Sequence, residues 1–224
     1  MYQIIADETD FLVINKSAKV HFHSQDGTAG VMAQLELDLG IKLYSVHRLD
    51  TMTSGLLLFA KSSEAAASFT AKFAAHQVQK YYLALAKGKP KKKQGSIIGD
   101  MAKSRRSMYK LLRSTENPAI TQFFSQSVAD GLRLYLLKPL SGKTHQLRVA
   151  LASIGVPILG DTLYGGEEAD RGYLHAYGLQ FELDGHLFEF CCMPSSGAFF
   201  VDEAVKNQLQ TWSKPEKLEW PKRK

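Results

Sequence analysis

One uninterrupted apolar run constrains the fold more than any other part of the chain: residues 55–60 read GLLLFA. A run of this length without a polar residue is typical of a β-strand that is buried on both faces. Ser62 or Ser63 can cap a helix directly after it. Phe69 and Phe73 then share one apolar stripe of this helix. The pattern therefore predicts a buried strand with a helix packed beside it.

The rest of the chain mixes strand and helix patterns without strict alternation. This mixture predicts an α+β fold, in which helices flank a mixed, largely antiparallel central sheet. Thr144 is expected to cap a helix that Gly155 and Pro157 end. The predicted strands also include residues 11–15, 80–86, 132–138 and 188–192, and the predicted helices include 29–39, 144–154 and 202–212.

Positive charge is concentrated in one segment. Residues 87–113 hold ten Lys and Arg but a single acid, Asp100, whereas the remaining chain holds eighteen bases and twenty-one acids. We expect this segment to be a basic insertion between strands. A basic segment on an otherwise balanced protein favours a polyanionic partner, because its cations release the counterions of phosphates. From charge alone, a solvated surface loop is an equally good interpretation.

The N-terminal residues and the cysteines predict a cytoplasmic protein. Asp7, Glu8 and Asp10 lie where a secretory signal would place basic and then apolar residues. No apolar run is long enough to span a membrane. Cys191 and Cys192 are adjacent, which strains any bridge between them and matches no metal or redox motif. Two unbridged thiols fit a reducing compartment.

Residues 46–55 (VHRLDTMTSG) bring an acid, bases and three hydroxyls together at the start of the buried strand. Such a turn can hold the carboxylate of Asp50 rigidly through hydroxyl and backbone hydrogen bonds, as a nucleophile or a base requires. Arg48 lies two residues before it. Judged by residue types alone, an ordinary salt-bridged turn is the favoured interpretation.

Several motifs together resemble one enzyme family. Residues 47–55 (HRLDTMTSG) closely resemble the signature of the RluA family of pseudouridine synthases, which isomerise uridine in RNA. Residues 80–84 (KYYLA) and 174–176 (LHA) resemble two shorter motifs of this family. Residues 142–149 (GKTHQLRV), followed by 155–165 (GVPILGDTLYG), resemble its second long motif. The motifs occur in the family's order and cover most of the chain.

The resemblance implies an RNA pseudouridine synthase, an isomerase that uses neither a metal nor an organic cofactor, with one catalytic domain over residues 1–224. Asp50 would be its essential carboxylate and would attack the nucleoside, either at the ribose or at the uracil ring. Tyr82 would stack on the uracil and handle its proton. Arg148 would pair with Asp50 and keep the carboxylate ionised.

The same resemblance implies binding roles for four further residues. Arg48 would enter the RNA helix where the target base is extruded. Leu174 would form a wall of the uracil pocket. Lys143 and His145 would bind the RNA, although with Arg148 near a helix N-terminus they also fit a phosphate site without catalysis. The implied partner is structured rRNA or tRNA, with no membrane and no nucleotide cofactor, and the implied state is a monomer.

Three positions depart from the family's pattern. Residues 16–19 read KSAK where the family usually has Lys-Pro-x-Gly, so the backbone is expected to differ there. Lys143 stands where arginine is usual, which keeps the charge but loses the bidentate fork. Ala150 replaces a frequent histidine. The catalytic pattern begins within the first dozen residues, so no separate N-terminal RNA-binding module is expected.

Three other functions fit the sequence less well than this one. Residues 141–144 read SGKT, which is part of a nucleotide-binding P-loop, but Leu137 stands where that loop needs a glycine. A catalytically inactive RNA-binding protein would lack an active-site residue, whereas all the catalytic candidates are present. Metal-dependent hydrolysis is disfavoured, because His47, Asp50 and His145 lack a recognised ligand spacing.

Overall fold

The apolar run of the sequence lies in strand β4 (Ser54–Ala60), and all seven residues of this strand are buried, as predicted. The structure is a computed structural model and describes residues 1–222. The chain forms two units, which are described separately. Unit 1 is Met1–Gln79 with His175–Met193, and unit 2 is Lys80–Leu174 with the chain from Pro194 onward. That they act as one catalytic domain stays a prediction.

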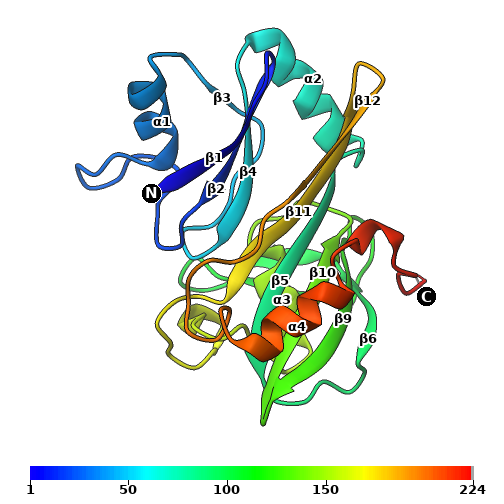
Figure 1. Cartoon of the computed structure of the whole chain (residues 1–224). Helices are drawn as coiled ribbons and strands as arrows, with labels where there is room; N and C mark the ends of the chain where they lie inside the picture. The colour runs from blue at the N-terminus through cyan, green and yellow to red at the C-terminus, as the bar shows by residue number, and fades with distance from the viewer. Residues whose placement is uncertain (223–224) are drawn as a thin grey trace. The chain divides into compact units, whose positions relative to one another are not determined.

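Unit 1 is a sheet with two helices (Figure 1). Besides β4, its elements are β1 (Tyr2–Asp7), β2 (Phe11–Lys16), α1 (Val31–Leu39), β3 (Tyr44–Ser45), α2 (Ser63–Ala74), β11 (Leu174–Leu183) and β12 (His186–Cys191). The strands lie in the order β1-β2-β4-β11-β12, and β3 pairs with β4. Only β4 and β11 pair in parallel within this unit's described sheet; the other pairs are antiparallel.

Aromatic rings build the core of unit 1 around α2. Ser62 caps this helix, since its hydroxyl accepts a hydrogen bond from the N–H of Ala65 at 3.1 Å. Phe69 is fully buried and meets Phe11 and Phe181 edge to face, with ring centroids 5.8 and 5.2 Å away. These contacts hold α2 against β2 and β11. The helix and the role of Phe69 were predicted correctly.

Unit 2 contains antiparallel strands and helices of its own. Its elements are β5 (Gln79–Lys87), β6 (Gln94–Gly99), β7 (Met101–Lys103), β8 (Tyr109–Leu111), β9 (Ala119–Ala129), β10 (Leu132–Pro139), α3 (Gln146–Ser153), α4 (Glu203–Thr211) and the short 3-10 helices η1 (Thr162–Tyr164) and η2 (Pro215–Lys217). Four strands lie in the order β5-β10-β9-β6, and β7 pairs with β8 as a separate hairpin.

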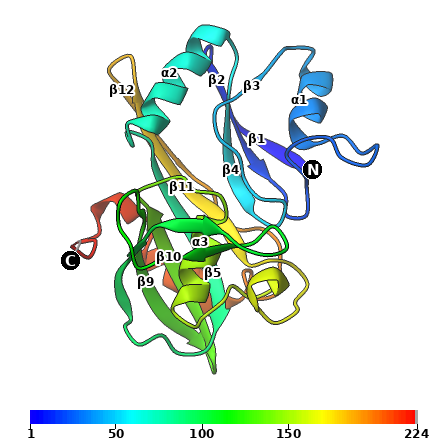
Figure 2. The ribbon, with the colours of Figure 1, turned by 180° about the vertical axis from the view of Figure 1, so that it is seen from behind.

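The helices of unit 2 cover both faces of its sheet. Figure 1 shows α4 in front of the strands, and Figure 2, drawn from behind, shows α3 in front of them. Helix α3 is almost entirely buried, and α4 buries Val205 and Leu209. The predicted α+β class, with a mixed, largely antiparallel sheet flanked by helices, is therefore confirmed. No helix within residues 1–222 combines the length and the apolar content that crossing a bilayer requires.

Two local predictions need correction. The basic segment 87–113 is not a plain insertion between strands, because it contains β6, β7 and β8. Helix α3 is not capped by Thr144: its N-cap is His145, which has φ of 57° and makes no capping hydrogen bond with its side chain. A histidine in this left-handed conformation is uncommon, so sequence patterns favour the threonine instead.

Candidate active site

Buried groups and a backbone hydrogen bond fix the turn that carries Asp50 in unit 1. The carbonyl oxygen of Asp50 accepts a hydrogen bond from the N–H of Thr53 at 2.9 Å. Leu49 is only 5% exposed and anchors the turn in the core. Asp50 itself is half-buried, and Arg48 is exposed. A rigid turn thus presents the carboxylate of Asp50 near the surface, with an arginine two residues away.

A fully buried lysine supports the same turn. The ammonium of Lys16 donates to the carbonyl oxygens of Ser17 and Val20, both at 2.9 Å, and makes a longer contact of 3.5 Å to that of Thr51. Lys19 follows with φ of 63°, the left-handed conformation that favours glycine. The position where the family usually has glycine therefore has a positive φ in this chain, which costs a residue with a side chain about 1–2 kcal/mol.

Gly55 ends the motif because another strand approaches it very closely. Its φ is 106°, and an added methyl group would lie 2.2 Å from the carbonyl oxygen of Ala176 on β11. Next to it, the Ser54 hydroxyl lies 2.7 Å from Nδ1 of His175, whose Nε2 lies 2.8 Å from the carbonyl oxygen of Cys192. Since a carbonyl only accepts, Nε2 of His175 carries a hydrogen. These contacts lock β4 to β11 immediately after the Asp50 turn.

His47 has a structural role in this turn. Its Nε2 accepts a hydrogen bond from the N–H of Leu58 at 2.9 Å, and its ring stacks on Phe73 with centroids 4.8 Å apart. Because this nitrogen accepts a hydrogen bond from a backbone N–H, it cannot bind a metal ion at the same time. Over residues 1–222, no group of three or more His, Cys, Asp and Glu side chains has an arrangement that could hold a metal ion.

Arg148 of unit 2 forms a buried, bidentate ion pair with Asp161. The Nε and Nη2 atoms of Arg148 donate to the two carboxylate oxygens, each at 2.7 Å. The side chains are 9% and 2% exposed. The guanidinium also lies over the ring of Tyr164, 4.9 Å from its centroid. The sequence reading had given neither Asp161 nor Tyr164 a role, and the predicted pairing of Arg148 with Asp50 stays a prediction.

Tyr164 connects Arg148 to His145 and to the basic hairpin. Its hydroxyl oxygen accepts a hydrogen bond from the N–H of Tyr109 on β8 at 2.9 Å. The same hydroxyl lies 2.8 Å from Nδ1 of His145. His145 and Arg148 are thus positioned by one phenol, whose ring contacts the guanidinium and whose hydroxyl contacts the imidazole. The backbone of the hairpin β7–β8 is tied to the start of α3 through this residue.

The loop before α3 is closed by Gln146, which rules out a P-loop geometry. The side-chain oxygen of Gln146 accepts from the Ser141 hydroxyl at 2.8 Å and from the N–H of Lys143 at 3.0 Å. Its amide group donates to the carbonyl of Ile120 and to the hydroxyl of Thr121. A P-loop needs its backbone N–H groups for phosphates, whereas here a buried glutamine occupies that of Lys143.

Lys143 extends toward the loop that follows the basic hairpin. Its ammonium donates to the side-chain oxygen of Asn117 at 2.9 Å. The carboxylate of Asp100 accepts from the N–H groups of Glu116 and Asn117 at 3.0 and 2.8 Å. A hydrogen bond from Ser114 lowers the pKa of Asp100 below its usual value. This network orders the loop that Lys143 contacts and leaves the lysine half-buried beside α3.

Strand β5 carries Tyr82 and a lysine on the same face. Tyr82 is half-buried, and Lys80, two residues earlier, points to the same side of the strand. A methyl group on Gly142 would lie 3.8 Å from Nζ of Lys80, so this ammonium sits beside the Lys143 loop. Burial lowers the pKa of Lys80 below the usual lysine value. Leu174, at the start of β11, is 3% exposed, and its role as a pocket wall stays a prediction.

Comparison with known proteins identifies the family. The model of the family described as RNA pseudouridylate synthase matches residues 10–153. An uncharacterized RNA pseudouridine synthase of Haemophilus influenzae is 46% identical over 213 residues, which cover 94% of this chain and 95% of that protein. The chain belongs to the RNA pseudouridylate synthase family.

Two further proteins are similar to the synthase. The tRNA pseudouridine synthase C of Yersinia pestis is 32% identical, and the matched region covers 80% of this chain and 76% of that protein. The solved structure of human RNA pseudouridylate synthase domain containing 1 has 27% identity and a TM-score of 0.77, with 96% of this chain and 95% of that chain covered. The resemblance to the RluA family is thus confirmed, and the synthase is an isomerase that modifies RNA.

The structure adds residues of the synthase that sequence reasoning missed. Asp161 and Tyr164 lie within the quoted motif GVPILGDTLYG, and Gln146 lies within GKTHQLRV, but no role had been inferred for them. Lys80 lies within KYYLA, where its spacing from Tyr82 placed both on one face. Asp161 is the one charged residue of the motif GVPILGDTLYG, which is a signal that could have pointed to an ion pair there.

Proposed function

We propose that the synthase isomerises a specific uridine in structured rRNA or tRNA, with Asp50 as its catalytic carboxylate. The observation that carries this proposal is the geometry of the Asp50 turn: a half-buried carboxylate stands on a turn fixed by Thr53, Leu49 and the buried Lys16. Such support holds a reacting group in place without cost at the moment of reaction. The name of the Yersinia relative supports tRNA as a substrate class.

The reaction needs no co-reactant, because a pseudouridine has the same atoms as a uridine. The bond between N1 of uracil and C1′ of ribose breaks, a bond between C5 and C1′ forms, C5 loses its proton and N1 gains one. Asp50 attacks either the ribose or the uracil ring, and in both routes it is the nucleophile. Tyr82 stacks on the uracil and handles the C5 proton, and Leu174 walls the pocket.

Arg148 keeps the attacking carboxylate ionised by pairing with Asp50, since an adjacent guanidinium stabilises the charged form. Its ion pair with Asp161 and its contact with Tyr164 support this role, because they hold the guanidinium plane in one orientation. Tyr164 is a positioning residue in this scheme. It acts through Arg148 and His145, which its ring and its hydroxyl contact.

The RNA is held by cations outside the reacting centre. Arg48, which is exposed, enters the RNA helix where the target base has been extruded. Lys143 and His145 bind phosphates beside α3. The basic segment 87–113 grips the backbone, and its hairpin β7–β8 is connected to His145 through Tyr109 and Tyr164. The synthase is expected to act as a monomer, which light scattering of the purified protein tests.

The decisive experiment maps pseudouridines in rRNA and tRNA from cells with and without the synthase, and restores it as wild type or as Asp50→Asn. Wild type should restore the missing modification, and the variant should not, because an amide of nearly the same shape can act neither as nucleophile nor as base. Binding of the same RNA should survive the substitution. A variant with turnover within about tenfold of wild type contradicts the role of Asp50. If the deletion strain keeps all of its pseudouridines, an inactive RNA-binding protein is favoured instead.

A further inference from the structure

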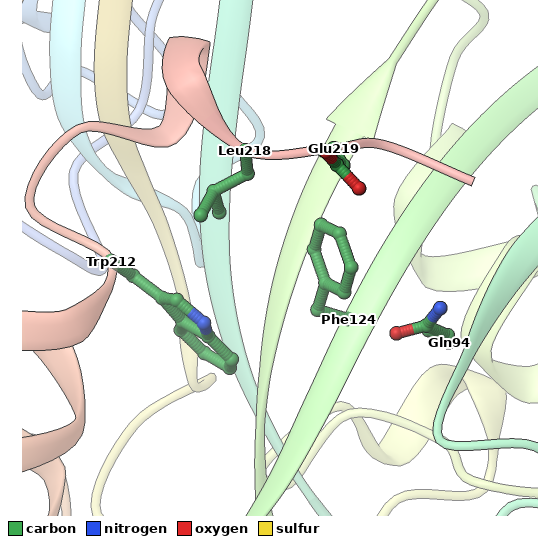
Figure 3. Close-up of a pocket in the computed structure, with 5 residues that line it drawn as sticks. All are labelled: Gln94, Phe124, Trp212, Leu218 and Glu219. Carbon is green, nitrogen blue, oxygen red and sulfur yellow. The ribbon is translucent and has the colours of Figure 1, made fainter.

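Unit 2 contains a pocket that the proposed chemistry does not use (Figure 3). Its volume is about 280 Å³, just below the usual range of ligand pockets. Gln94 of β6 and Phe124 of β9 line it on the side of the sheet, and Trp212, Leu218 and Glu219 line it from the C-terminal segment. Gln94 and Phe124 are direct partners in the β6–β9 ladder, so their side chains share one face.

The wall from the C-terminal segment is fixed to the sheet. The Trp220 ring lies 4.9 Å from Phe124 and is stacked 5.9 Å from Tyr81, between centroids. Its indole N–H donates to the carbonyl of Pro215 at 2.8 Å. Lys138 adds a cation over the Trp220 ring, 5.6 Å from the centroid. The pocket is therefore built before any ligand arrives, and filling it requires little ordering of the protein.

The lining suits one planar base. Two aromatic side chains line the pocket, Phe124 and the largely buried Trp212, which is 8% exposed. Stacking on aromatic side chains is the usual way that proteins hold an unstacked base of single-stranded RNA. Figure 3 shows the Glu219 carboxylate and the Gln94 amide on the same side of the pocket as Phe124, with Trp212 opposite. Among residues 1–222, Glu219 forms no ion pair. Its carboxylate is thus available to a ligand.

The polar groups of the lining match guanine better than the other three RNA bases. A carboxylate only accepts hydrogen bonds, and guanine alone presents two adjacent donors, N1–H and the N2 amino group, on its Watson–Crick edge. The amide of Gln94 can donate to O6 of the same edge. Adenine, cytosine and uracil each offer the carboxylate a single donor group. Glu219 and Gln94 together therefore match the pattern of guanine.

The charges around the pocket suit a nucleotide that belongs to a polyanion. Exposed lysines precede the lining residues on both sides: Lys93 comes directly before Gln94, and Lys217 comes directly before Leu218. Cations at these places can reach phosphates, while the negative charge of Glu219 disfavours a phosphate inside the pocket. The charges thus suit a base inside the pocket and its phosphate backbone outside it.

We propose that this pocket binds one unstacked guanine of the substrate RNA, a base other than the reacting uridine. The inference rests on the proposed function, because it takes structured RNA as the substrate. It makes the pocket a specificity site: an RNA with a guanine extruded at the right distance from its target uridine is bound more tightly than one without.

The test uses the intrinsic fluorescence of the synthase, because its two tryptophans, Trp212 and Trp220, line the pocket or contact its wall. The full chain is titrated with the four nucleoside 5′-monophosphates. Guanosine monophosphate should quench the fluorescence at concentrations about tenfold lower than the other three, the difference expected for a hydrogen bond to a charged group. Equal quenching by all four nucleotides, or none, overturns the proposal.

Two variants and a control separate this site from a general electrostatic surface. Glu219→Gln should weaken the binding of guanosine monophosphate about tenfold. The affinities for the other three nucleotides should stay the same or rise slightly. On a non-specific surface, the loss of a negative charge would strengthen the binding of all four nucleotides equally. Phe124→Leu, which keeps an apolar side chain, should weaken guanosine monophosphate about fivefold through lost stacking. Glu216→Gln, the same change on the same segment but outside the lining, should change nothing.

Activity is measured separately, as pseudouridine formed in unfractionated RNA. A wild type that forms pseudouridine but does not discriminate nucleotides refutes the guanine site and leaves the proposed function intact. A wild type that discriminates nucleotides but modifies no RNA refutes the proposed function and leaves the binding site standing. With an RNA substrate identified, Glu219→Gln should raise KM and leave kcat unchanged, since the site acts on binding alone.

Discussion

The ion pair between Arg148 and Asp161 gives the sharpest test of the site architecture. Both side chains are almost completely buried, and two hydrogen bonds of 2.7 Å join them. Asp161→Asn keeps the shape of the side chain but removes its charge, and it presents an amide N–H group to a guanidinium that can only donate. Arg148 then loses its charge partner in unit 2 while it stays buried.

The expected loss of stability follows from burial. Removing one partner of a buried ion pair costs about 3–5 kcal/mol. Because asparagine still accepts one hydrogen bond, we expect the lower end, about 3 kcal/mol, which corresponds to a fall in Tm of about 6–12 °C for a chain of this size. The matched control is Glu167→Gln. Glu167 pairs with Lys87, and both side chains are exposed, Lys87 to 51% and Glu167 to 61%. That change should cost at most about 1 kcal/mol.

Urea unfolding followed by tryptophan fluorescence measures both variants. Trp212 and Trp220 belong to unit 2, as Arg148 and Asp161 do, so the signal reports unfolding of the unit that contains the pair. The midpoint should fall much further for Asp161→Asn than for Glu167→Gln, with little change in the slope of the transition. Equal midpoints for the two variants would refute the reasoning, because they would show that the buried pair contributes no more than a surface pair.

Three further predictions concern the chemistry, the RNA and the thiols. Tyr82→Phe should retain base stacking but impair product formation, measured as pseudouridine formed per bound RNA; a fully active variant would show that the phenol handles no proton. Alanine at all three lysines of 91–93 should make the slope of log affinity against log salt shallower by about two to three units, with the rate at saturating RNA unchanged. Burial raises the pKa of Cys192 to about 11, so at about pH 8 an alkylating reagent should modify the exposed Cys191 first, as peptide mass mapping can show.

The parts of the fold that the sequence predicts well are those in which local pattern and burial agree. Strand β4 is apolar throughout and buried throughout, and α2 has both its serine cap and its apolar stripe. Strand β9 was missed because its sequence, AITQFFSQSVA, places polar residues in the buried part of a sheet. Gln122 and Ser125 donate there to the distant carbonyls of Pro221 and Lys93, and the Ser125 hydroxyl also accepts from Arg133. Such partners lie too far along the chain for a local pattern to reveal.

The candidate site was predictable as a set of motifs but not as a set of contacts. Sequence indicates that Arg148 needs an acidic partner, yet it does not say which of the chain's acids comes within 2.7 Å, and Asp161 is thirteen residues away. His145 was placed inside the predicted helix, whereas its left-handed φ makes it the N-cap. Its contact with Tyr164 helps to hold this unusual conformation. Both features depend on how η1 folds back onto α3.

Glycines in the motifs separate packing from chemistry. A methyl group on Gly160 would lie 1.9 Å from the carbonyl oxygen of Arg171, and one on Gly55 would meet Ala176 at 2.2 Å. Any larger residue at either position must therefore displace a neighbouring backbone before it alters a reacting group. Activity that is lost on substitution of these glycines consequently reports on backbone geometry. Shape-preserving changes such as Asp50→Asn isolate the reaction itself, because they leave that geometry in place.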